Sequence, residues 1–238
     1  MKLNQIIVLF ILVFFGITII INIGSTQFPV NEVSYLDDVL ESNGSLNVVT
    51  AIYLDYRLYD SLFEVIVFFI AAFGVSMVLN KLPKSTLESQ EEIDYVYDAV
   101  DMRMSISGNI IFFLSLLFSL YIMITGHLGP GGGFVGGVIA GTGLLVISGN
   151  RDVEEIETEL KKMRIHLIEK IVMFFIPASG FLGLIFYHQG LKNFLPAGVP
   201  GTLFSGGNAL LFNLLIGFKV FVGTWTILYN FVRHRGSI

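Results

Sequence analysis

Six long apolar runs constrain this chain more than any other feature of its sequence. Most are close to the roughly 20 residues with which an α-helix crosses a hydrocarbon core about 30 Å thick. Backbone donors and acceptors find no water in lipid, so each spanning segment must satisfy them internally as a helix. The alternation typical of a membrane β-barrel is absent. The sequence therefore predicts an all-α integral membrane protein with about six transmembrane helices, at about Ile6–Ile23, Ser61–Leu79, Ile106–Thr125, Phe134–Ser148, Leu167–Tyr187 and Leu210–Val232.

Composition supports lipid as the main solvent. Hydrophobic residues make up 54% of the 238 residues and charged residues only 14%, against about 25% charged in a soluble domain. The chain has no cysteine, which excludes disulfides and thiolate metal ligands. A formal net charge of −5 without a basic patch speaks against nucleic-acid binding. We expect a multi-pass protein of the cytoplasmic membrane.

Lysine and arginine positions predict the orientation, because cytoplasmic loops carry an excess of both. The first run has only Lys2 as a positive start and no A-x-A site after it, so we expect it to be kept as a span rather than cleaved. If the amino terminus lies inside, outside loops carry only Arg57 and Lys192. An even number of spans also places both ends on one side, so both termini are predicted to be cytoplasmic. The inside segments then carry Lys2, Lys81, Lys84, Arg103, Arg151, Lys161, Lys162, Arg164, Arg233 and Arg235.

Polarity divides the chain into two membrane blocks. Residues 1–82 hold two predicted spans joined by a long outside segment, within which Val48–Leu54 is expected to be extended or interfacial. Residues 83–105 form a polar, acidic linker that we expect to be cytoplasmic, and residues 106–238 hold four spans. The loop at 151–164 carries charges at helical spacing, which predicts a solvated amphipathic turn or two.

Two acids stand at the start of the second predicted span. Asp60 and Glu64 are four residues apart, so a helix places them on one face. Asp60 suits the amino-terminal end of the helix dipole, whereas Glu64 lies about one turn inside the lipid. An ionisable group at that depth usually marks an ion pathway or a partner. Both acids are therefore candidate ion-pathway residues, with Arg57 as a candidate neutralising partner; a helix cap plus an interfacial acid is the alternative.

Lys219 lies about ten residues into the last predicted span. At 1.5 Å per residue this depth is about 15 Å, close to the midplane. A lysine so deep either exchanges protons or forms a structural salt bridge. Few deep acids are evident in the chain, so we expect the partner on another subunit. Lys219 is the third candidate ion-pathway residue.

A glycine-rich segment from Gly126 to Gly137 follows the third span. Its G-x-G-x-x-G match is weak evidence for nucleotide binding, because a dinucleotide site needs a preceding strand in a βαβ unit. Spacings of four residues instead predict a small-residue face for close helix packing. His127 in this turn is a fourth ion-pathway candidate, with a structural role as the alternative. The packing glycines are Gly132, Gly133, Gly136, Gly137 and Gly141.

Other polar residues predict membrane-edge or packing roles. His166, Glu169 and Lys170 suggest interfacial anchors, and Asn208 and Asn213 are expected to hydrogen-bond between helices. No nucleophile triad, metal-ligand cluster or phosphate loop is present. We therefore expect no catalytic residue, metal or cofactor in this chain.

Two motifs resemble known families. D-Y-R-L-Y-D-S-L-F-E at residues 55–64 resembles the carboxy-terminal part of the large A subunit of Mrp-type multisubunit sodium/proton antiporters, and the E subunit of membrane-bound hydrogenases. G-H-L-G-P-G-G-G-F-V-G-G at residues 126–137 resembles the signature of the antiporter's MnhB subunit, or of the hydrogenase F subunit. The chain thus resembles a fusion of two subunits at the polar linker.

The resemblance implies a membrane subunit of a complex that translocates Na⁺ and H⁺. The Gly217-Phe-Lys219 string is nearer the hydrogenase-type subunit, whereas the antiporter's MnhB subunit often has an acid near this region, where this chain has Asn213. A module coupled to a hydrogenase or sulfur-reductase peripheral arm is therefore favoured over a stand-alone antiporter. A scaffold subunit with no ion path, and a self-contained transporter, are the alternatives. Other membrane subunits and the bilayer are the expected partners.

Overall fold

The computed structural model describes residues 13, 16–17, 39–81, 94–149, 151–187 and 193–234; of residues 41, 94–106 and 180–187 it describes the backbone alone. The chain divides into two compact units, Met1–Ser34 and Tyr35–Ile238. Most of the first predicted span, part of the predicted linker and both chain ends lie outside the described residues. The predicted orientation of the termini therefore stays a prediction.

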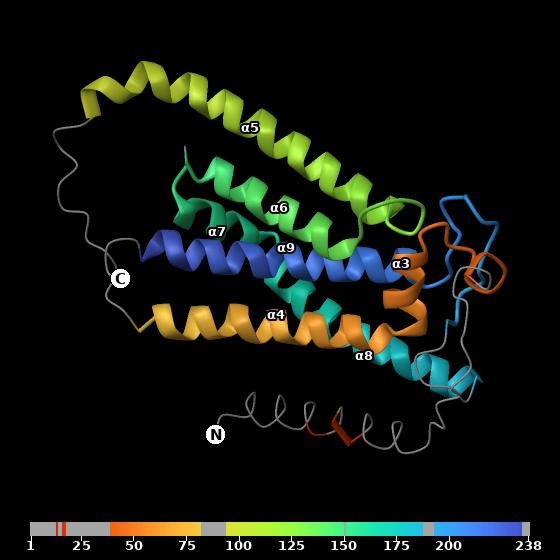
Figure 1. Ribbon diagram of the computed structural model, residues 1–238. Coiled ribbons are helices and arrows are strands. Elements are labelled where there is room, and N and C mark those ends of the chain that lie inside the picture. The colour runs from red at the N-terminus through yellow and green to blue at the C-terminus, as the bar shows by residue number, and fades with distance from the viewer. Residues whose placement is uncertain are drawn as a thin grey trace. The chain divides into compact units, whose positions relative to one another are not determined.

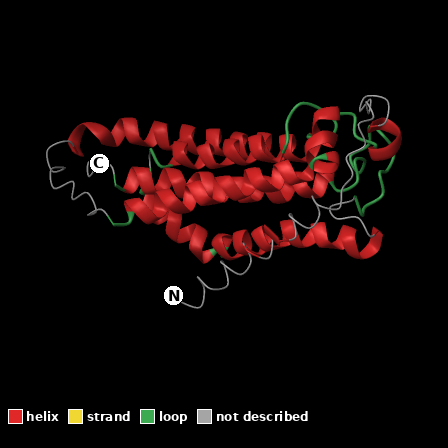
Figure 2. Ribbon diagram, turned by 60° about the horizontal axis from the view of Figure 1, so that its bottom comes forward, coloured by secondary structure: helices red, strands yellow, loops and turns green. Residues whose placement is uncertain are grey.

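Every regular element of the larger unit in the described residues is helical (Figures 1 and 2). Four of the helices begin and end within a few residues of an apolar run, because those runs are what lipid selects. In chain order the elements are η1 (Val39–Asn43), α3 (Val48–Ala51), η2 (Ile52–Tyr56), α4 (Leu58–Leu79), α5 (Asp94–Thr125), α6 (Gly133–Ile147), α7 (Val153–Lys162), α8 (Ile165–Tyr187) and α9 (Ala209–Arg233).

Helix α9 lies at the centre, with α4, α5, α6, α7 and α8 packed against it (Figure 1). The most apolar 18-residue window of α9 is 56% buried, against 22% in α4 and 17% in the corresponding part of α5. These three helices are long and apolar enough to cross a membrane, and α6 is shorter at 15 residues. The predicted number of six spans is not tested by these helices alone.

The outer faces of α4 and α5 are apolar. Large exposed hydrophobic side chains cover both helices, and a soluble monomer rarely exposes so large an apolar surface. This surface and the all-helical architecture confirm the predicted class, an all-α membrane protein. Examples are Phe63, Val67, Ile70, Phe73, Ile110, Phe113, Leu117 and Phe118.

Glycines let α6 approach α9 closely. Gly133, Gly137 and Gly141, each four residues apart, face α9. A Cβ atom at Gly137 would lie 2.5 Å from the carbonyl oxygen of Gly217, and one at Gly141 2.6 Å from Thr224 Cβ. Gly136 faces α5 instead, where a Cβ atom would lie 2.6 Å from Met123 Cγ. The close packing of α5, α6 and α9 therefore depends on glycine at these positions, where a side chain would clash.

The segment before α4 closes one end of the bundle. The Asn47 amide donates hydrogen bonds to the carbonyl oxygens of Gly126 and Gly129, at 2.9 and 2.6 Å, and Thr50 donates to Gly126 at 2.7 Å. This segment is helical in α3 and η2, so the expectation of an extended stretch at Val48–Leu54 is wrong. The Asn47 side chain explains the difference, because it caps α3 by accepting from the Thr50 backbone amide.

One further helix begins earlier than predicted, and the helical turn or two predicted at residues 151–164 is longer than expected. Helix α5 begins at Asp94, inside the segment expected to be linker. The charged loop after α6 forms the ten-residue helix α7, capped by Asp152. Arg164, with φ 57°, then interrupts the helical backbone between α7 and α8, so α8 starts in a new direction.

Candidate ion-pathway site at Lys219

Lys219 is buried in the middle of α9, with 1% of its surface exposed. It lies about 15 Å from the start of α9 at 1.5 Å per residue. Its Nζ atom also lies 4.8 Å from the ring centroid of Phe69, near the midpoint of the 22-residue helix α4. Two helices of membrane-spanning length thus place this ammonium near the level of the bundle's midplane.

The counter-ion of Lys219 belongs to the same chain. Its Nζ atom donates a hydrogen bond to Glu169 Oε1 of α8, whose side chain is 16% exposed. The expectation that the partner lies on another subunit is therefore wrong. The sequence places Glu169 at the edge of an apolar run, where an acid suggests an interfacial anchor. Because α8 starts beside the middle of α9 rather than at its end, that acid instead meets the buried lysine.

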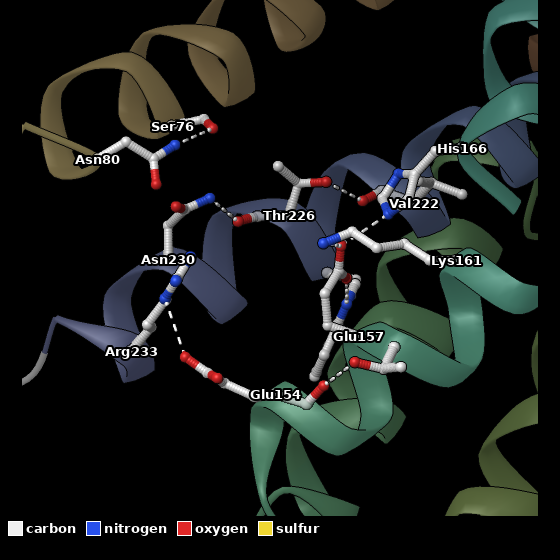
Figure 3. Close-up of polar contacts among 12 residues, drawn as sticks. Ser76, Asn80, Glu154, Glu157, Lys161, His166, Val222, Thr226, Asn230 and Arg233 are labelled. Atoms are coloured by element: carbon white, nitrogen blue, oxygen red, sulfur yellow. Dashed lines mark hydrogen bonds and ion pairs between the residues drawn. The ribbon is translucent and has the colours of Figure 1, made fainter. Parts of the chain in front are cut away.

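The pair continues into a chain of polar side chains on α7 and α8. His166 Nδ1 lies 3.7 Å from Glu169 Oε2, and His166 Nε2 lies 3.0 Å from Glu157 Oε1. Glu157 is 8% exposed; its Oε2 accepts a hydrogen bond of 2.9 Å from Trp225 Nε1 of α9. Lys161 Nζ approaches Glu157 Oε1 at 3.2 Å. Figure 3 shows Glu157, His166 and Lys161 turned toward one another.

The contacts among these polar side chains stabilise their charged forms. His166 and Glu157 both precede the apolar span that begins at Leu167. Contact with Glu157, and then with Glu169, raises the pKa of His166 to about 9. Burial alone would raise the pKa of Glu157, but hydrogen bonds from His166 and Trp225 outweigh it and hold that pKa below its usual value. An imidazolium therefore lies between two carboxylates at neutral pH.

Interactions at both ends of α7 stabilise the helix that carries Glu157. Asp152 caps it by accepting from the Glu154 amide at 3.1 Å. Acids occupy its first turn and lysines its last, which matches the helix dipole. Where α7 meets the end of α9, Arg233 Nε of α9 lies 3.3 Å from Glu154 Oε1 of α7 (Figure 3).

The acids at the start of α4 form a separate group. Arg57 pairs with Asp60 at 2.7 Å, and both side chains are more than half exposed. Glu64 is exposed on the same helix. No hydrogen bond or ion pair connects Glu64, Asp60 or His127 to Lys219 in the part of the chain that the structure describes. The four ion-pathway candidates are thus not brought into one site.

His127 lies in a buried polar cluster at the opposite end of α9 from Arg233. Its ring is fully buried, with Nε2 at 3.4 Å from the Thr202 carbonyl oxygen. Burial lowers the pKa of His127, although hydrogen bonding to the backbone of Thr202 and Leu203 opposes this. Nearby, Asn213 Oδ1 accepts a hydrogen bond of 2.9 Å from the Gly133 backbone amide, which joins α9 to α6.

The described residues contain no group of histidines and acids arranged to hold a metal ion. Their chemistry is that of ion pairs and proton donors. Sequence reasoning singled out Lys219 but missed its connection to Glu157, His166 and Trp225. The spacings Glu157–Lys161 and His166–Glu169 are regular helix pairs, and no signal in them indicates that they meet Lys219.

The helices and the buried charges define an all-α membrane protein with ionisable groups in its interior. A family model described as "Domain related to MnhB subunit of Na+/H+ antiporter" matches residues 104–226, more than half of the chain. The chain therefore belongs to this MnhB-related family. The match covers α6, α7, α8 and α9 as far as Thr226, and so includes Lys219, Glu169, His166 and Glu157.

Individual relatives agree with the family. The chain is 38% identical over 47 residues to the B-type subunit of the Na(+)/H(+) antiporter of Bacillus subtilis (strain 168), a match that spans 20% of this chain and 33% of that relative. It resembles a chain in the solved membrane-bound sulfane sulfur reductase, described as an archaeal respiratory membrane complex, at 25% identity and TM-score 0.62, over 98% of this chain and 99% of that one. A chain of the Mrp complex from Dietzia sp. DQ12-45-1b shares the fold at 17% identity and TM-score 0.66, over all of this chain and 27% of that one.

Proposed function

We propose that this chain is a multi-pass subunit, in the cytoplasmic membrane, of a multisubunit module that translocates Na⁺ and H⁺. The observation that carries the proposal is the buried Lys219–Glu169 pair at the centre of an MnhB-related chain. Ionisable groups at that depth are costly and typically mark ion or proton paths. Family membership and the likeness to chains of multisubunit complexes support the same conclusion.

A redox-linked complex is the setting that we favour over a stand-alone antiporter. The likeness to a chain of the sulfane sulfur reductase extends over nearly the full length of both chains. The likeness to the Mrp complex is in fold and covers about a quarter of a longer chain. We propose other membrane subunits as partners, together with a hydrogenase or sulfur-reductase peripheral arm that supplies the redox chemistry.

The exposed face of α4 supports a partner subunit. Glu64 lies about a turn and a half into α4, on a helix whose outer face is otherwise apolar, with Phe63 and Val67 as neighbours. A carboxylate against lipid tails is unfavourable, so we propose that Glu64 faces a neighbouring subunit and contributes to the ion pathway there. Asp60 and Arg57 lie at the membrane edge beside it.

The test is transport by the whole complex. The complex is purified through a tag on this chain, its subunits are identified, and Na⁺-dependent proton movement is followed in vesicles with a pH-sensitive dye. We expect co-purified membrane subunits, and much slower proton movement with Glu64→Gln at normal assembly. Glu155→Gln, at an exposed acid of α7, is the matched control and keeps full activity.

A scaffold subunit is the second candidate, and the tight glycine packing of α6 on α9 favours it. A scaffold predicts that Glu64→Gln impairs assembly or changes nothing, but never uncouples an assembled complex. Wild-type vesicles without any Na⁺-dependent proton movement would refute the transport function.

A further inference from the structure

Helix α7 lies beside the second half of α9, and α8 begins beside the middle of α9, both running antiparallel to it (Figure 1). The contacts occur in order along the helices: Glu154 with Arg233, Glu157 with Trp225, and Glu169 with Lys219. At 1.5 Å per residue, Trp225 lies about 9 Å beyond Lys219 along α9. Glu157 therefore lies toward the Arg233 end of the bundle from Lys219, before the apolar span that begins at Leu167.

Helix α7 also carries exposed charged side chains beside these buried polar contacts. The side chains of Glu155, Glu159 and Lys161 are 57%, 50% and 63% exposed. Charged groups do not face acyl chains, and they are normally placed against water or protein. Water that reaches α7 from the end of the bundle at Arg233 would be separated from Glu157 by a single side chain.

We propose that Glu157, His166 and Glu169 form a proton relay that connects Lys219 with water at the α7 end of the bundle. This relay deepens, and rests on, the transport function proposed above. Its key feature is His166, whose two ring nitrogens each face a different carboxylate. An imidazole can take up a proton at one nitrogen and release the other nitrogen's proton, which is the basis of histidine proton shuttles.

Each step of the relay conserves protons. His166 rests as an imidazolium between the carboxylates of Glu157 and Glu169. Once Lys219 has given up its proton, the imidazolium gives its Nδ1 proton to Glu169, and Glu169 passes a proton to the neutral amine of Lys219. His166 is then neutral with its proton on Nε2, and exchange with water at this 30% exposed side chain moves the proton to Nδ1. Glu157, protonated from water, gives its proton from Oε1 to the free Nε2, which restores the imidazolium and leaves Glu157 and Glu169 as carboxylates. The reverse order carries a proton outward.

The same contacts could serve only to hold α7 against α8 and α9. A structural latch needs hydrogen-bonding groups but no proton exchange. Chemical rescue separates the two roles, because added imidazole can carry protons at neutral pH whereas pyrazole, of the same ring shape, is far too weak a base. His166 is 30% exposed, so a small ring can reach the space left by alanine.

The experiment measures Na⁺-dependent proton movement in vesicles that contain the whole complex with His166→Ala. We expect a loss on the order of tenfold or more, as for other positioned acid–base groups, at normal assembly. Added imidazole should restore most of the rate and pyrazole should not. Arg151→Gln is the control, because it breaks the ion pairs that Arg151 forms with Glu155 and Glu159 of α7 and leaves the relay residues unchanged.

Full activity of His166→Ala, or equal rescue by pyrazole, would overturn the relay while leaving the transport function intact. If His166→Ala fails to assemble, Glu157→Gln decides, because its amide oxygen still accepts from Trp225. Slow proton movement in an assembled Glu157→Gln complex supports the relay, and an unchanged rate overturns it. A wild-type complex that moves no protons refutes the proposed function and the relay with it.

Discussion

A buried lysine and a buried carboxylate stabilise each other's charge, and either one alone is costly. Lys219 and Glu169 are such a pair, with 1% and 16% of their side chains exposed. Their sequence signals differ. An ammonium inside an apolar run is anomalous, so Lys219 could be identified from the sequence. Glu169 and His166 stand in a mixed segment where interfacial charges are common, and their partnership with Lys219 depends on how α8 lies along α9.

The pair predicts strong coupling between two substitutions. Glu169→Gln leaves a buried ammonium without its counter-ion, which we expect to destabilise the protein by roughly 3–5 kcal/mol. Lys219→Met combined with Glu169→Gln removes both charges and should cost clearly less than Glu169→Gln alone. Thermal unfolding of the detergent-solubilised complex measures the loss of stability for Glu169→Gln, for Lys219→Met and for the double variant. A double variant as unstable as the sum of the single ones would show that the two side chains do not interact.

His166 predicts a pH dependence. Its pKa rises from 6.5 to about 9 in the folded chain, because contacts with Glu157 of α7 and Glu169 of α8 favour the protonated ring. Lys161 and Lys219 contact the same two acids. A raised pKa contributes stability that is fully present below about pH 6.5 and is lost as the pH rises through about 9. The stability difference between wild type and His166→Gln should therefore be largest near pH 6 and shrink toward pH 9. A difference that grows with pH would contradict this assignment.

Among the elements, the apolar runs predicted the helices well and the polar segments poorly. Lipid selects long apolar helices, so α4, α6, α8 and α9 begin and end within a few residues of the predicted spans. Helix α5 begins at Asp94 because polar residues can continue a helix beyond the bilayer, which no hydropathy pattern can register. The break at Arg164 is a tertiary feature, and the residues around it show no proline or glycine to indicate it.

The α6–α9 contact predicts a steric effect. Gly137→Leu places a side chain against the backbone of Gly217, which cannot rotate away, and we expect a loss of roughly 1–3 kcal/mol or more. A lowered thermal midpoint of the solubilised complex is the readout. Gly129→Ala is the control, since nothing lies within 4 Å of a Cβ atom there. Equal stability of the two variants would mean that α6 does not pack as described.

At the scale of the whole molecule, orientation is open to direct measurement. The chain has no cysteine, so single cysteines can be introduced without background from this chain. Phe204→Cys, at a side chain 79% exposed between α8 and α9, should react with an impermeant maleimide from outside intact cells. Ser89→Cys in the predicted cytoplasmic linker should react only after the membrane is opened. The reverse pattern would invert the predicted topology.

From Tyr35 on, the described parts of both predicted blocks belong to one compact unit, Tyr35–Ile238. Asn47 and Thr50, before α4, hold the glycine-rich turn before α6. The sequence indicated a fusion of two subunit types, but not that the first type would close the end of the second. That contact depends on side-chain hydrogen bonds between residues far apart in the sequence, which local patterns do not encode.

The most direct test of a charge pathway through this protein is proton and sodium flux in vesicles that carry the complete complex with Lys219→Ala. Subunit composition is measured on the same preparation, so that assembly and transport are compared in one sample. We expect a complex that assembles with all its subunits but exchanges Na⁺ for H⁺ at a small fraction of the wild-type rate. An assembled complex with wild-type exchange would contradict the account.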